Sequence, residues 1–172
     1  MMTRPDLSNV PAFYKNYVEH VKDMDLSHAL RQAGKQIQHL LVSVTEEKGT
    51  YRYAEGKWSV KEVLNHMMDA ERVFTYRALR FSRNDQTPLH PFDENEYAVR
   101  ANAHSRTIQH LAREMQWLRE TTIDLYDSFT PEMLQRQGTA SNQKISVLNL
   151  GYIIAGHDVH HRKILMERYL NS

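Results

Sequence analysis

The chain of 172 residues has the length of one ordinary domain, and its 25% charged and 41% apolar residues are typical of a globular protein. The 22 Lys and Arg residues balance 21 Asp and Glu residues, so the chain lacks the positive excess of a dedicated nucleic-acid binder. The absence of cysteine excludes disulfides, iron–sulfur clusters, Cys-ligated zinc and cysteine nucleophiles. We therefore expect a single domain over residues 1–172 that binds no nucleic acid. Its one compositional surplus is ten histidines.

No segment of the sequence has the character of a membrane anchor or a secretion signal. The N-terminal residues lack the uninterrupted apolar core of a signal peptide. The longest apolar stretch, residues 147–155, contains Asn149 and Gly151 and falls short of the ~18 residues needed to cross a bilayer. These features predict a cytoplasmic protein that works without a membrane.

The first half of the chain shows helical periodicity. Residues from Pro11 to Val21 predict a short lead-in helix with proline in its first turn. Asp25 is placed to cap a long helix that closes near Gly49. A second long helix starts at Ser59, where an S-x-x-E capping box marks its first turn, and runs to about Arg83.

The second half of the chain predicts two more long helices joined by polar segments. Residues 84–100 hold two prolines and four acids, which fits a long surface crossover, with a lid over a site as the alternative. The third helix is predicted over about 103–128, followed by a short turn at 130–132 and a polar loop over 135–145. The fourth helix begins near Ser146 and continues to the end of the chain. Four long amphipathic helices with no convincing strand predict an all-α helical bundle, whose order the long crossover leaves open.

Three histidines fall on the apolar faces of these helices. At 100° per residue, His157 and His161 lie in the middle of the apolar arc of the fourth helix, while His160 lies on its edge. His66 lies within the apolar arc of the second helix. Ionisable side chains in a core stripe need a physical reason to be there.

Three inward imidazoles are the ligand set of an open metal site, because three protein ligands leave one position for water or substrate. The alternative is that each is a hydrogen-bonded core histidine. The run H-D-x-x-H at 157–161 also approximates the H-E-x-x-H of zinc proteases, but aspartate is one methylene too short to ensure the geometry of the general base. The histidine pattern therefore favours a metal site without indicating a protease.

The sequence resembles the DinB/YfiT-like superfamily over nearly its whole length. The resemblance is carried by W-S-V-K-E-V-L-N-H at 58–66, by E-R at 71–72 and Y-R at 76–77, and by G-H-D-V-H-H at 156–161. It implies a four-helix bundle in up-down-down-up order, usually a homodimer, that holds one divalent metal. The matching ligand positions are His66, His157 and His161, the same three that the helical wheels select.

The resemblance leaves the activity open. Relatives include metal-dependent transferases that use low-molecular-weight thiols. We therefore expect a metal-dependent transferase or hydrolase that acts on a small molecule, with zinc, nickel or iron and with or without a thiol cosubstrate. The alternatives are a non-catalytic dimeric bundle in which the metal links the second helix to the fourth, and a metal-free bundle. A fourth protein ligand such as His104 would close the site and favour the non-catalytic alternative.

Several other residues carry weaker expectations. His104 and His160 are candidates for roles near the site, with a cap or core position for His104 and solvent exposure for His160 as the simpler interpretations. Glu71 is expected to pair with an arginine such as Arg100 or Arg168 rather than to orient a ligand. Asp158 is expected to be solvated or ion-paired. Gly156, in mid-helix, indicates close approach of another element.

Overall fold

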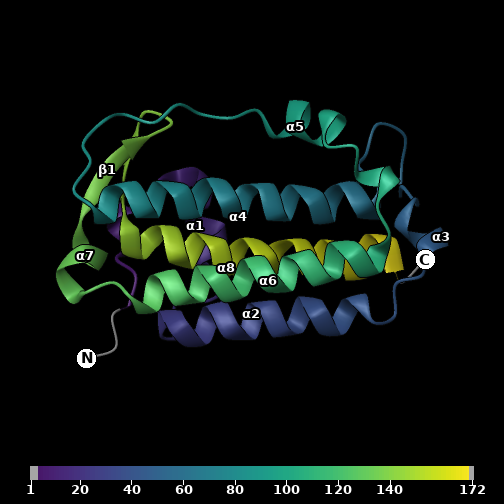
Figure 1. Ribbon diagram of the computed structural model, residues 1–172, viewed down its shortest axis with the longest axis horizontal. Coiled ribbons are helices and arrows are strands. Elements are labelled where there is room, and N and C mark those ends of the chain that lie inside the picture. The colour runs from purple at the N-terminus through teal and green to yellow at the C-terminus, as the bar shows by residue number, and fades with distance from the viewer. Residues whose placement is uncertain (1–3, 171–172) are drawn as a thin grey trace.

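Four long helices form the body of the protein in the computed structural model, which describes residues 4–170 (Figure 1). They are α2 (Leu26–Leu41), α4 (Val60–Ser82), α6 (Ile108–Asp127) and α8 (Val147–Ile164). The side chain of an Asp, Ser or Thr caps the first turn of each by accepting a backbone N–H, and these caps are Asp25, Ser59, Thr107 and Ser146. The capping box at Ser59 and Glu62 is confirmed in both of its hydrogen bonds.

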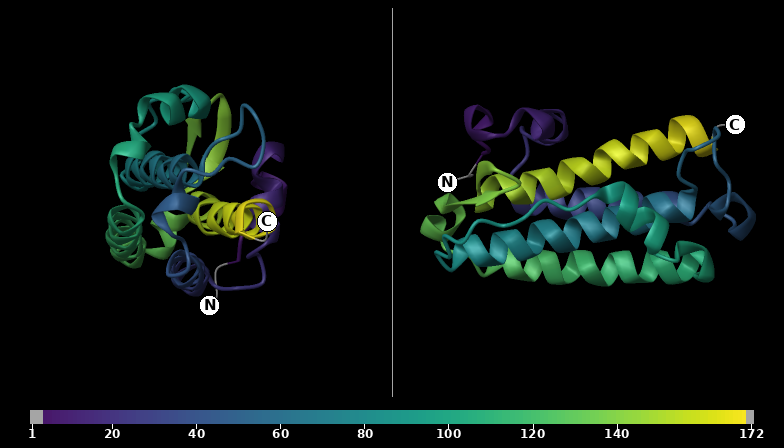
Figure 2. Two further views of the ribbon diagram at one scale, coloured as in Figure 1. Left: turned by 90° about the vertical axis from the view of Figure 1, so that its right-hand side faces the viewer. Right: turned by 90° about the horizontal axis from the view of Figure 1, so that it is seen from above.

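The helices run in up-down-down-up order, as the resemblance implied. In Figure 1, α2 and α8 run from left to right, while α4 and α6 run from right to left. Each of α2 and α4 packs against both α6 and α8. The segment between α4 and α6 crosses the whole length of the bundle, which allows these two helices to run in the same direction (Figures 1 and 2).

Short elements complete the fold. The lead-in helix α1 (Ala12–Glu19) is confirmed; it packs against α8 and has Pro11 at its N-cap. The other helical pieces are η1 (Leu7–Asn9), α3 (Glu46–Gly49), α5 (Glu94–Arg100), η2 (Ala103–Ser105), α7 (Pro131–Gln135) and η3 (Leu165–Leu170), a π-helical continuation of α8.

Two predicted helices are shorter than periodicity indicated. The first ends at Leu41 instead of Gly49, because the Ser43 hydroxyl donates to the Leu40 carbonyl and Thr45 caps a new turn, α3. The third begins at Ile108 instead of 103, since Thr107 caps it and residues 103–105 form a separate turn. In both places a hydroxyl side chain competes with the continuing helix for backbone groups.

The prediction of a polar loop over 135–145 is wrong. Strands β1 (Gln137–Ala140) and β2 (Gln143–Ser146) pair in an antiparallel hairpin. Its two turn residues, Ser141 and Asn142, both have positive φ, which is the conformation of a type I′ turn. The turn lacks the glycine that usually signals such a hairpin, so the sequence pattern was weak.

The apolar core is divided into two clusters. A hairpin-side cluster fills one end of the bundle and includes Leu30, Phe74, Phe81, Tyr126 and Ile153. An α3-side cluster fills the other end and includes Ile37, Leu64, Met67, Leu111 and Tyr169. Buried polar side chains from α4, α6 and α8 lie between the two clusters. We call them the polar layer, and they are Glu71, Arg119, Asp158, His66, His157 and His161.

Within residues 4–170, no helix is both long and apolar enough to cross a bilayer.

Candidate metal centre

The structure brings His66 of α4 together with His157 and His161 of α8. The Nε2 atom of His157 lies 3.1 Å from that of His66 and 3.0 Å from that of His161. One ring nitrogen from each of the three residues lies within 4.8 Å of the others. His157 and His161 are one helical turn apart on α8, so their rings share a face, and the α4–α8 packing brings His66 to the same point.

All three imidazoles are buried, and burial keeps them neutral. Burial lowers the pKa of His66 to about 4, with a further contribution from the charge of His160. Burial also holds the pKa values of His157 and His161 well below the ordinary value, and the neighbouring imidazoles add to this effect. Neutral imidazole is the form that binds metal ions, so the site needs no proton release from these rings at neutral pH.

The donor set fits a divalent ion of the zinc class. Two ligand nitrogens at tetrahedral positions around zinc, each ~2.0–2.1 Å away, lie about 3.3 Å apart, close to the separations measured here. Without an ion, three ring nitrogens would lie at hydrogen-bond distance although each neutral imidazole has only one N–H group to donate. The Nδ1 atom of His161 is also buried and has no hydrogen-bond partner among residues 4–170.

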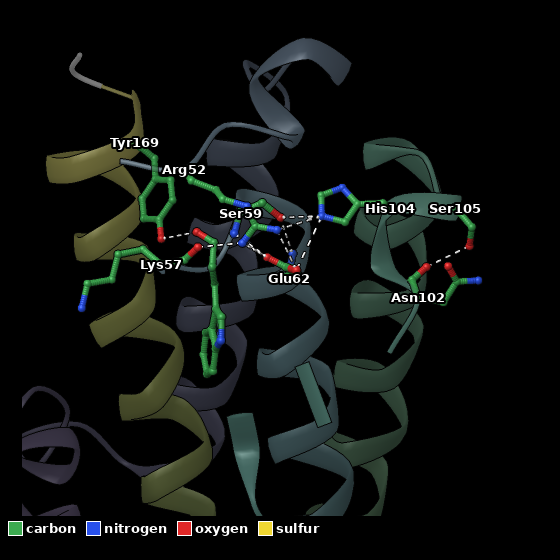
Figure 3. A network of polar contacts seen from close by, with 9 residues as sticks. Arg52, Lys57, Ser59, Glu62, Asn102, His104, Ser105 and Tyr169 are labelled. Carbon is green, nitrogen blue, oxygen red and sulfur yellow. Dashed lines mark hydrogen bonds and ion pairs between the residues drawn. The ribbon is translucent and has the colours of Figure 1, made fainter. Parts of the chain in front are cut away.

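No fourth protein ligand belongs to the cluster within the described part of the chain. His104, the residue most able to close the site, lies at the start of α4, where its Nε2 is 3.3 Å from the Ser59 hydroxyl and 3.6 Å from the Glu62 carboxylate (Figure 3). It is therefore a cap histidine, which was the simpler of its two interpretations.

The segment before α4 covers one side of His66. The Trp58 ring lies over the His66 imidazole with a centroid distance of 4.7 Å. The Trp58 carbonyl accepts a hydrogen bond from the Tyr169 hydroxyl at 2.8 Å, while Arg52 bonds to the Lys57 carbonyl (Figure 3). The contact with Tyr169 ties the segment to η3, the continuation of α8, and keeps the indole in place.

A small cavity of about 40 Å³ opens beside His66 and His157. Its walls come from α1, α4 and the 84–100 crossover, and its lining residues are Phe13, Tyr14, Tyr17, Ala70, Phe74, Phe92 and Glu94. This volume accommodates roughly one to three water-sized groups. The sequence is compatible with either a surface loop or a lid over residues 84–100. In the structure, this crossover forms one wall of the cavity.

Gly156 allows α1 to lie against α8 at the site. A Cβ at this position would stand 2.0 Å from the Tyr17 carbonyl oxygen, which is backbone and cannot swing away. The close approach that the sequence indicated therefore comes from α1. It places the Tyr17 ring 5.3 Å from the His157 ring and 5.0 Å from that of His160, which is half-buried rather than exposed.

The remaining part of the polar layer is a buried ion cluster around Arg119. This guanidinium donates two hydrogen bonds to the Glu71 carboxylate, both 2.9 Å, and one of 2.8 Å to Asp158. Glu71 therefore pairs with Arg119 and not with Arg100 or Arg168, and Asp158 is ion-paired. Sequence reasoning missed Arg119, although its position eleven residues after Ile108 puts it on the same apolar face of α6.

Two carboxylates share the single charge of Arg119, and this imbalance affects Asp158. Burial, together with the charge of Glu71, raises the pKa of Asp158 to about 6 in spite of Arg119. A cavity of about 430 Å³ between α2 and α6 has this cluster as its floor. It is larger than the cavity beside the histidines, but none of the three imidazoles lines it.

The sequence is similar to those of several known proteins. The model of the DinB superfamily matches residues 29–165. The chain is 24% identical over 121 residues to "Putative metal-dependent hydrolase OB0413" of Oceanobacillus iheyensis, covering 69% of each chain. It is 25% identical over 142 residues to "Putative metal-dependent hydrolase" of Geobacillus thermodenitrificans, covering 80% of this chain and 79% of the relative.

The fold also matches a solved structure, that of YfiT from Bacillus subtilis, described as "a probable metal-dependent hydrolase with an unusual four-helix bundle topology". The TM-score is 0.75 at 16% identity, and the match covers 98% of this chain and 93% of that chain. The family model spans most of the chain, including the segments that hold all three histidines. The chain belongs to the DinB superfamily.

Proposed function

We propose that this protein is a metal-dependent hydrolase of a small molecule, with His66, His157 and His161 as the ligands of one divalent ion. The observation that carries the proposal is the convergence of three buried, neutral imidazoles beside a small cavity with no fourth protein ligand among residues 4–170. When bound, such an ion acts as a Lewis acid that lowers the pKa of a coordinated water or thiol. The names of the two curated relatives support the hydrolase class.

The residues of this chain supply the setting. The neutral imidazoles present lone pairs at one point, and Trp58 and Tyr17 cover two sides of them. The aromatic walls of the cavity exclude bulk water and leave room for a small reacting group. Transfer to a low-molecular-weight thiol is the second candidate. Hydrolysis is favoured because both curated relatives are named as metal-dependent hydrolases.

The first experiment is elemental mass spectrometry on untagged protein. We expect about one equivalent of zinc, nickel or iron in the wild-type protein and none in His66→Ala or in His157→Ala/His161→Ala. His104→Ala is the matched control, since the change is the same and His104 lies outside the cluster; its metal content should equal that of the wild type. No bound metal, with no thermal shift on adding zinc or nickel, would contradict the proposal.

The second experiment separates hydrolysis from transfer and from a purely structural metal. The loaded protein is assayed with p-nitrophenyl acetate and bis(p-nitrophenyl) phosphate, with and without an added thiol. Turnover without thiol supports the hydrolase, whereas turnover that requires thiol supports the transferase. A full equivalent of metal with no turnover in either condition favours the non-catalytic bundle. The homodimer that the resemblance implies is a separate proposal, which sedimentation velocity tests.

A further inference from the structure

Glu94 lines the same small cavity as two histidines of the cluster. It is the first residue of α5 and follows the capping residue Asp93 on the crossover. It lines the cavity together with His66 and His157, and its side chain is half-buried. It is the only carboxylate among the lining residues.

Glu94 lies outside the ligand set, and its charge is not neutralised by an ion pair. The cluster of nitrogen and oxygen donors within 4.8 Å of one another contains the three histidines alone among residues 4–170. Over the same described part of the chain, no lysine, arginine or histidine forms an ion pair with Glu94. A carboxylate that lines one cavity with two of the proposed metal ligands, and that is neither a member of the cluster nor ion-paired, is available to accept a proton.

Buried contacts hold this part of the crossover in place. Arg77 of α4, 3% exposed, donates to the His90 carbonyl at 3.0 Å and to the Ser141 hydroxyl at 3.1 Å. Leu89 exchanges backbone hydrogen bonds with the hairpin, donating to Thr139 at 2.9 Å and accepting from Ser141 at 3.0 Å. The segment leading to Glu94 is therefore anchored to both α4 and the hairpin, and Glu94 has a defined position over the cavity.

The groups that face Glu94 come from three elements. Tyr14 and Tyr17 of α1, His66 of α4 and His157 of α8 line the cavity together with it, and Arg77 of α4 lies beside Tyr14. Burial raises the pKa values of both tyrosines, and the charge of Glu94 adds to this for each. The tyrosines are therefore neutral donors, so Glu94 is the one group in this cavity with an acceptor oxygen and a negative charge.

We propose that Glu94 is the general base of the hydrolysis, a role that rests on the proposed function. Its carboxylate takes one proton from a water molecule while the water oxygen bonds to the electrophilic atom of the substrate. The bond to the leaving group then breaks, and Glu94 returns the proton to that group. One water molecule is consumed, and Glu94 ends in its starting state.

The test compares Glu94→Gln with Glu96→Gln, using Co²⁺ as the spectroscopic metal. Glu96 is the matched control because it lies on the same helix, carries the same charge and pairs instead with Arg100. We expect both variants to bind cobalt as the wild type does. Glu94→Gln should lower kcat for p-nitrophenyl acetate by about 10²–10⁴-fold, the usual range for loss of a general base. Glu96→Gln should leave kcat unchanged.

A second readout does not depend on turnover. Azide is an anion that displaces water from an open cobalt site and changes its visible spectrum. Because Glu94 repels an incoming anion, Glu94→Gln should bind azide on the order of tenfold more tightly, while Glu96→Gln should match the wild type. The absorption titration should show this difference at neutral pH and low salt, where the charge of Glu94 is screened least.

The outcomes separate the two proposals. A wild-type protein that binds no cobalt overturns the metal site and the role of Glu94 together. Normal cobalt binding with unchanged azide affinity and unchanged kcat in Glu94→Gln overturns the role of Glu94 alone. Weaker cobalt binding in Glu94→Gln would identify Glu94 as a ligand, which also contradicts its role as a base.

Discussion

At the residue scale, His66 couples the stability of the metal-free protein to pH. Its pKa is about 4 in the folded protein and ~6.5 when unfolded, so below pH 6.5 the unfolded state binds a proton that the folded state does not. The free energy of unfolding should therefore fall as pH drops from about 6.5 to 4. The contribution of His66 over that window is at most about 3 kcal/mol.

The measurement is urea denaturation at pH 7, 6 and 5 in EDTA, comparing wild type with His66→Asn. Asp158 has an opposite effect, because its pKa is raised to about 6 and its carboxyl protonates first in the folded state. Both proteins contain Asp158, so the difference between them reports on His66. The free energy of unfolding should depend less on pH in the variant; equal slopes would contradict the assignment of a buried neutral imidazole.

Arg119 is the residue on which the other half of the polar layer depends. Arg119→Met keeps most of the side-chain volume but leaves Glu71 and Asp158 buried without a counter-charge. We expect a loss of about 3–5 kcal/mol in the free energy of unfolding at pH 7, and a smaller loss at pH 5, where the Asp158 carboxyl, whose pKa is raised to about 6, is protonated. Arg100→Met, which removes an exposed partner of Glu96, should cost less than about 1 kcal/mol.

At the scale of elements, the position of α1 depends on the missing side chain of Gly156. Gly156→Ala would place a Cβ against the Tyr17 backbone and force α1 away from α8. Overpacking of this kind costs about 1–3 kcal/mol, more than alanine returns in helix propensity. Because α1 is displaced, the cavity beside His157 should become larger in the variant. Thermal stability should fall, and amide exchange in residues 12–19 should become faster.

Gly151→Ala is the control in the same helix. The Cβ there would meet the ends of the Tyr126 and Leu26 side chains, which can shift, and the gain in helix propensity is the same. Its effect on stability should be smaller than that of Gly156→Ala, with normal exchange in α1. Equal effects in the two variants would show that backbone contact at Tyr17 is not the limiting factor.

At the scale of the whole molecule, the polar layer divides what could be one continuous core. Its ion cluster is expensive to bury, and apolar replacements of matched size are often neutral or stabilising. Glu71→Met/Arg119→Met/Asp158→Leu should therefore recover the stability lost in Arg119→Met and come within about 1 kcal/mol of the wild type. Thermal and urea unfolding check this; a triple variant as unstable as Arg119→Met would show that the ion cluster itself contributes favourably.

The sequence determined most of the long helices and all three histidines of the candidate metal site. Capping side chains and a 3.6-residue apolar period are local properties, so Ser59 and Ser146 could be recognised as helix starts and the inward faces of His66, His157 and His161 could be calculated. The same calculation applied to α6 would have found Arg119 on the inner face. Its buried partners could not be named, because pairing depends on which helices become neighbours.

Tertiary structure alone decided the remaining features. The distance between His66 and the pair on α8 depends on the stagger of two helices, and 91 positions of sequence separate His66 from His157. The hairpin at 137–146 is held by strand pairing and by two backbone hydrogen bonds with Leu89, a residue distant in sequence. Glu94 reaches the cavity only because the crossover is anchored on α4. Periodicity along one helix predicts which face of that helix a side chain occupies. The contacts of the side chain depend on packing between helices, and the candidate metal site is formed by such contacts between segments distant in sequence.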